Sequence, residues 1–203
     1  VAVVTVDGGT IANGTLIGSN YANTSNVYAL KSGAVSAVLG EMNSGVQQQS
    51  ANKTTAGTLI LSGVNTYTGT TTVTAGVLAT ATNDGVLRST ASVTVAATGT
   101  LRIGTTERLD ALVSTGIIDF ATGRLNLGLA NTNTTLAGTI TGTGGTLNKD
   151  GTGSLTVTGS NSFAGDTILT AGVLRAGSNT AFGVSVLNLN AGRFTSDGST
   201  ART

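Results

Sequence analysis

The stretch that decides the fold is residues 53–79, KTTAGTLILSGVNTYTGTTTVTAGVLA. It recurs at residues 149–175 as KDGTGSLTVTGSNSFAGDTILTAGVLR, at a constant offset of 96 residues. Both copies begin with Lys, place Gly, Leu and Asn at matching positions, and reach the same Ala-Gly-Val-Leu. Internal repeats indicate solenoids, propellers or repeat arrays, so the chain is expected to be a repeat protein.

A shorter repeat also runs along the chain, in which an apolar residue follows a glycine two positions later. We call this pattern a Gly-x-apolar step. The steps are Gly57-Leu59, Gly76-Leu78, Gly99-Leu101, Gly123-Leu125, Gly153-Leu155, Gly172-Leu174 and Gly192-Phe194, with another at Gly138-Ile140. Between the steps, apolar residues alternate with Thr or Asn, as in Val93-Thr-Val95 and Leu125-Asn-Leu127. This alternation places the apolar side chains on one face of each strand.

Short strands with one apolar face must bury that face against neighbours. A propeller blade of ~40–50 residues or a sandwich with turns every ~8–12 residues does not match a repeat length of about twenty residues. One coil of a parallel β-helix does, because stacked coils share a continuous narrow core. The chain of 203 residues is therefore predicted to be an all-β, parallel β-helix of roughly ten coils, as a single domain over residues 1–203.

Two segments interrupt the β pattern in the sequence. The amide-rich region of about 41–52 and the charged region of about 105–115 are expected to leave the coil as excursions. The sequence of the second region is typical of the start of a short helix, and a solvated loop is the alternative.

The composition excludes several classes of function. His and Cys are absent, so catalysis by Ser-His-Asp or Cys-His and metal sites built on imidazole or thiolate are impossible. The net charge is +1 and the basic residues are scattered, which argues against a nucleic-acid surface. No apolar run is long enough for a transmembrane helix. No cofactor is expected, and neither is membrane insertion by this segment.

The acidic residues are too dispersed to indicate a site, so no catalytic, cofactor-binding or metal-ligating residue is assigned. Glu107 and Asp110 are the closest pair and are interpreted as part of a salt-bridged loop. Coil stacking could also bring Asp150 to Asp166. Asn65 and Asn161 are interpreted as turn residues, with ligand contact as the alternative. Tyr67 and Phe163 are interpreted as core or corner residues, with sugar stacking as the alternative.

Residues 57–78 resemble the passenger-associated β-strand repeat of bacterial autotransporters, and residues 153–174 resemble it again with Phe163 in place of Tyr. Residues 136–149 resemble the lead-in to such a repeat, and residues 28–39 a degenerate form of it. The resemblance implies a right-handed β-helical passenger on a Gram-negative cell surface. It also implies further repeats and a C-terminal outer-membrane barrel in the parent protein.

The expected function is a structural and adhesive stem segment without catalysis. Its expected partners are glycans or proteins of host or bacterial surfaces, or further copies of itself. One alternative is a β-helical glycan-active enzyme. Another is an ice-binding solenoid, which needs Thr in register on one flat face. The coil lengths vary from 19 to 24 residues or more, and this variation argues against such a face.

Overall fold

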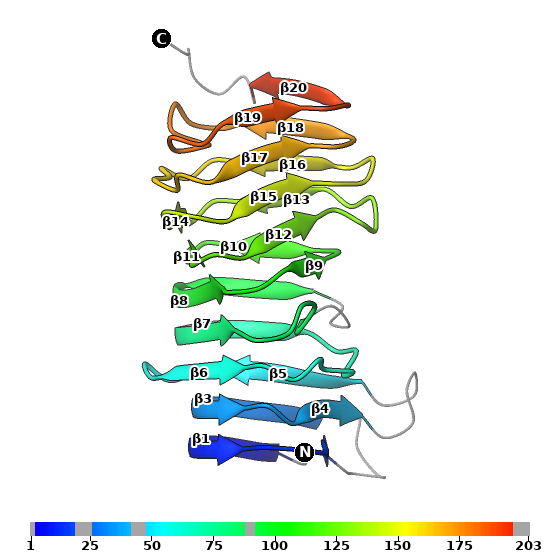
Figure 1. Cartoon of the computed structure of the whole chain (residues 1–203), viewed down its shortest axis with the longest axis vertical. Helices are drawn as coiled ribbons and strands as arrows, with labels where there is room; N and C mark the ends of the chain where they lie inside the picture. The colour runs from blue at the N-terminus through cyan, green and yellow to red at the C-terminus, as the bar shows by residue number, and fades with distance from the viewer. Residues whose placement is uncertain (1–2, 19–25, 42–47, 88–91, 197–203) are drawn as a thin grey trace.

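The computed structural model describes residues 3–18, 26–41, 48–87 and 92–196. In these residues all regular structure is β, and the strands stack into an elongated solenoid (Figure 1). The strands are β1 (Val3–Ile11), β2 (Thr15–Gly18), β3 (Asn26–Val35), β4 (Val38–Glu41), β5 (Gln49–Lys53), β6 (Thr58–Leu61), β7 (Thr71–Thr80), β8 (Val93–Ile103), β9 (Glu107–Leu109), β10 (Leu112–Ser114), β11 (Ile117–Phe120), β12 (Arg124–Leu127), β13 (Thr134–Leu136), β14 (Thr139–Thr141), β15 (Thr146–Lys149), β16 (Ser154–Val157), β17 (Asp166–Leu169), β18 (Val173–Ala176), β19 (Leu187–Leu189) and β20 (Arg193–Ser196).

Among the described residues the main sheet has 13 strands, and β6, β11 and β14 pair beside its main path. This path runs β1-β3-β5-β7-β8-β10-β13-β16-β18-β20, and the pairing along it is parallel. Parallel partners need a crossover connection, and here each crossover is the remainder of one coil. The parallel pairing along this path confirms the prediction of an all-β, parallel β-helix.

Each coil has three sides, which we number in chain order. Side 1 contains β5, β10, β13, β16 and β18, and side 2 contains β6, β11 and β14. The long strands β7 and β8 cover both of these sides. Side 3 is the separate sheet β9-β12-β15-β17-β19. The inward side chains of every side stack in register, for example Leu59, Leu78 and Leu101 on side 2.

The core is a narrow column of apolar side chains that runs the length of the solenoid. Leu and Val supply most of it, and two aromatic pairs fill its wider parts. Tyr28 and Tyr67 have ring centroids 6.1 Å apart, and Phe120 and Phe163 lie 5.8 Å apart. Tyr67 and Phe163 are both buried, which confirms their interpretation as core residues.

The two repeat copies occupy different sides of the solenoid. Lys53 ends β5 on side 1, whereas Lys149 ends β15 on side 3. In the main sheet, Lys53 is followed at the same position on successive coils by Val73, Val95, Ser114 and Leu136. Leu136 therefore lies on side 1 four coils after Lys53, and Lys149 lies two sides farther along the chain. The same repeat sequence can therefore begin on different sides of the coil.

The prediction of an excursion at about 105–115 is wrong. This segment contains β9 and β10, which pair in register with β12 and β8. Its charges suggested a loop, but Glu107 points inward and takes a regular core position. Of the predicted excursion at about 41–52, residues 42–47 lie outside the described residues, and Gln49–Lys53 forms β5.

Candidate functional site

The outward side of side 1 carries a column of small, uncharged side chains, which we call the threonine face. Its members occupy the centre of successive strands and are Asn52, Thr72, Thr94, Val113, Thr135 and Thr156. They are exposed or half-buried. Adjacent parallel strands lie ~4.8 Å apart, so the column repeats at that spacing along the rod.

Further threonines flank this column one outward position along the chain. They are Thr54, Thr74, Thr115 and Thr158. Thr54, Thr115 and Thr158 directly follow the ends of β5, β10 and β16, so they extend the uncharged surface towards the corner. The result is a surface of mostly threonine side chains, in which none of the members named above is ionisable.

The register of this face persists although the coils differ in length. The pairing of β7 with β8 is continuous except for one irregularity between Val73 and Ala75, at the corner between sides 1 and 2. Extra residues are therefore absorbed at corners, and the centres of the strands stay aligned. The expectation that variable spacing takes the outward positions out of register is therefore wrong for residues 52–156, although Asn52 and Val113 interrupt the threonines.

The uncharged column ends at Arg175, which pairs with Thr156 on the next coil. Other charged side chains lie on other parts of the surface. Arg102 and Asp119 form an ion pair at 2.7 Å on side 2, and Lys31 and Asp7 pair at 3.0 Å near the N-terminal end. Exposed ion pairs of this kind contribute little to stability. Between Asn52 and Thr156, the members of the threonine face carry no charge.

Asn65 and Asn161 are buried and bond to the backbones of the coils on both sides. The Oδ1 of Asn65 accepts from the Leu39 amide at 2.8 Å, and its Nδ2 donates to the Val86 carbonyl at 3.0 Å. Asn161 accepts from the Ile140 amide at 2.6 Å and donates to the Ala181 carbonyl at 2.5 Å. Both side chains are thus structural bridges across three coils, and their amide groups are not available to a ligand.

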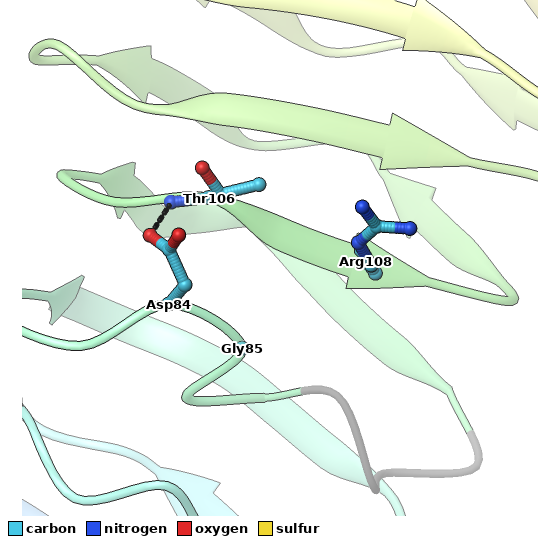
Figure 2. A pocket seen from close by; sticks show the side chains of 4 residues that line it. All are labelled: Asp84, Gly85, Thr106 and Arg108. Carbon is cyan, nitrogen blue, oxygen red and sulfur yellow. Dashed lines mark hydrogen bonds between the residues drawn. The ribbon is translucent and has the colours of Figure 1, made fainter.

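A small hollow of about 110 Å³ opens beside β9 and is lined by Asp84, Gly85, Thr106 and Arg108 (Figure 2). The Asp84 carboxylate accepts a hydrogen bond from the Thr106 amide at 2.9 Å. Arg108 lies farther along β9 and is exposed. The carboxylate is already bonded to backbone, and this hydrogen bond joins the turn at Asp84 to the next coil.

Glu107 is a buried acid that sequence reasoning missed. Its side chain is 0% exposed and accepts hydrogen bonds from the amides of Val86 and Leu87, at 3.3 and 3.0 Å. Burial raises the pKa of Glu107 to about 7, although these hydrogen bonds oppose the shift. The one available signal was the alternation Glu107-Arg-Leu109, which matches Leu125-Asn-Leu127 on the next coil.

The structure does not bring together the acid pairs that the sequence suggested. Glu107 points into the core, whereas Asp110 is exposed, so the predicted salt-bridged loop is wrong. Asp166 lies opposite Thr146 on β15, whereas Asp150 follows the end of that strand. Among the described residues, no three acidic side chains gather into a group that could hold a metal ion. No helix in this part of the chain is long and apolar enough to cross a membrane.

Comparison with protein families identifies the repeated stretch. The passenger-associated-transport-repeat matches twice, at residues 52–79 and 147–176. These ranges agree with the copies at 53–79 and 149–175. No curated protein and no solved structure matches the chain.

Proposed function

From the two passenger-associated-transport repeats that this chain carries and its β-solenoid fold, which together fit an autotransporter passenger domain, we propose a structural and adhesive role without catalysis. In this proposal the chain is a segment of the stem of a secreted bacterial surface protein. The solenoid holds a long surface away from the cell, and adhesion takes place along that surface.

The observation that carries the adhesive role is the threonine face. It repeats one short pattern over six coils, from Asn52 to Thr156. A single hydroxyl contact is weak, but many identical contacts on one rigid rod act together with a high effective concentration. A neutral face also meets no charge repulsion from a cell envelope. Glycans or proteins of host or bacterial surfaces, or a second copy of the stem, are the partners that such a face suits.

The test is adhesion of bacteria that display the intact parent protein. We expect Thr72→Lys, Thr94→Lys and Thr135→Lys together to reduce surface attachment or cell aggregation at least severalfold. The matched control changes outward threonines of side 2, Thr100→Lys and Thr139→Lys, which lie on either side of Ile117. Surface display is measured in parallel by antibody binding.

Equal loss in both sets of variants would contradict the choice of surface. Adhesion and aggregation no greater than those of a passenger-deletion strain would contradict the adhesive role itself.

An ice-binding solenoid is a second candidate, and the aligned threonine face is the observation that favours it. Ice is uncharged and periodic, and each of its water molecules donates and accepts hydrogen bonds, as threonine hydroxyls do. The test is thermal hysteresis of the purified chain near 0 °C, with Thr72→Lys and Thr94→Lys as the variants expected to abolish it. Absence of thermal hysteresis in the purified chain would remove this candidate.

A further inference from the structure

The two lysines that open the repeat copies occupy core positions. Lys53 is 0% exposed and Lys149 is 1% exposed. Lys53 stacks in one inward column with Val73, and Lys149 stacks between Leu127 and Leu169. A lysine at a position that its neighbours fill with valine or leucine requires a compensating interaction, because burying an unpaired ammonium is costly.

That compensation comes from backbone carbonyls at the corner that follows each lysine. Lys53 Nζ donates to the carbonyl of Thr55, and to that of Ala75 on the next coil at 3.1 Å. Lys149 Nζ donates to the carbonyls of Asp150 and Gly151, the latter at 2.8 Å. Burial lowers the pKa of both lysines, and Asp150 opposes this shift for Lys149.

The next coil packs a glycine on those same corners. Gly76 has φ +70° and Gly172 has φ +73°. A Cβ at Gly76 would overlap the carbonyl oxygens of Thr55 and Gly57, and a Cβ at Gly172 would overlap those of Gly151 and Gly153. The corner carbonyl of Thr55 or Gly151 therefore accepts a hydrogen bond from the buried lysine and also packs against the glycine of the next coil.

Both corners then continue with the same hydrogen bond. The Val77 amide donates to the Gly57 carbonyl at 3.2 Å, and the Val173 amide donates to the Gly153 carbonyl at 3.1 Å. Lysine, corner carbonyl, glycine and amide recur at the offset of 96 residues, although the copies lie on different sides of the solenoid. Two independent occurrences of one geometry indicate a function of the repeat itself.

We propose that Lys53 and Lys149 are built-in cations that clamp the corners of the repeat, so that each fixes the register of the coil stacked on its corner. The ammonium replaces the water that would otherwise satisfy the corner carbonyls. It thereby orients these carbonyls for the glycine and the amide of the next coil. The pair would divide the stem into units that open separately.

A crossed hydrogen-exchange experiment on the whole chain tests this proposal. In Lys53→Met, we expect exchange of the Val77 amide to accelerate about tenfold or more while that of Val173 is unchanged. In Lys149→Met, the effect should be reversed. Lys31→Met is the matched control, because the Lys31 ammonium pairs with Asp7 and bonds to neither corner, so this variant should change neither amide. If a methionine variant fails to fold, the glutamine variant at the same position, Lys53→Gln or Lys149→Gln, replaces it.

Chemical rescue separates the charge from the packing. In Lys53→Ala, n-propylammonium carries the missing carbons and the ammonium, and it should restore protection of Val77 alone. The neutral analogue 1-propanol should restore little. Unchanged protection in the lysine variants, equal loss at both amides, or equal rescue by 1-propanol would overturn the proposal.

Discussion

At the scale of single residues, buried polar side chains of this solenoid bind its backbone. Asn65, Glu107 and Lys53 all point into the core, and each bonds to main-chain groups of a neighbouring coil. A corner interrupts the ladder of hydrogen bonds between strands and leaves donors and acceptors without partners. Buried polar groups of this kind must be satisfied. These side chains supply the missing partners where the strands stop.

Glu107 should make the stability of the chain depend on pH around neutrality. Its pKa is about 7 in the fold, against 4.5 as the ordinary value, so the folded state binds the proton more tightly. This contribution is fully present below pH 4.5 and is lost as the pH rises through 7. Between about pH 5 and about pH 8.5 we expect a loss of about 2 to 3 kcal/mol in the free energy of unfolding. Urea unfolding at both pH values measures it.

Glu107→Gln should remove most of this dependence, because glutamine does not titrate. Glu41→Gln is the control, since Glu41 is only half-buried and bonds to the Thr68 amide at 3.0 Å. A wild-type chain that is equally stable at both pH values would show that Glu107 is not a protonated core group.

Removing an asparagine bridge should be more costly than removing an exposed asparagine. Asn65→Ala leaves the Leu39 amide and the Val86 carbonyl buried without this partner, and Asn161→Ala does the same at Ile140 and Ala181. We expect each to lower the free energy of unfolding by about 2 to 4 kcal/mol. Chemical denaturation measures this loss. Asn190→Ala, at an exposed position, should cost less than about 0.5 kcal/mol. Equal effects of all three would contradict the bridging role.

At the scale of elements, the strands were predictable from sequence and the corners only partly so. Alternation in Val93-Thr-Val95 predicts a strand because inward and outward residues differ in polarity. The same rule failed at Glu107, where a charged residue takes an inward position and finds its partners in an earlier turn. Alternation also predicts Thr on the outward side of the strands, but the register of the threonine face escaped sequence reasoning. Spacing between steps varies with corner length, whereas register depends only on how the strand centres pair.

The corner glycines provide a test that separates two costs of an added side chain. Gly172 and Gly9 have nearly the same φ, +73° and +71°, but a Cβ at Gly9 meets nothing within 4 Å. Gly9→Ala should therefore cost about 1 kcal/mol, which is the strain of the left-handed backbone alone. Gly172→Ala adds the overlap with Gly151 and Gly153 and should cost several kcal/mol more. Thermal unfolding measures both, and equal losses would show that the corner has room.

At the scale of the whole molecule, the solenoid is a one-dimensional stack in which each coil contacts its neighbours. Stability is then roughly the sum of coil and interface terms, and the end coils have one interface fewer. The coil nearest the C-terminal end reflects this. Among its large apolar residues, Val184 is 77% exposed, Val186 62%, Leu189 54% and Phe194 42%. Leu189 stacks on the inward column through Leu169, so a core position is left partly open.

The isolated 203-residue chain should therefore associate end to end. Pairing of an open strand edge and burial of the apolar side chains both favour contact between two such coils. Sedimentation should show species that grow with protein concentration.

Leu189→Lys with Phe194→Lys should shift the chain towards monomer, because each places a charge at the contact. Val113→Lys, an equally exposed apolar residue on side 1, should leave association unchanged. A clean monomer at high concentration would contradict the prediction, and loss of association only in Val113→Lys would move the contact from the coil end to the threonine face.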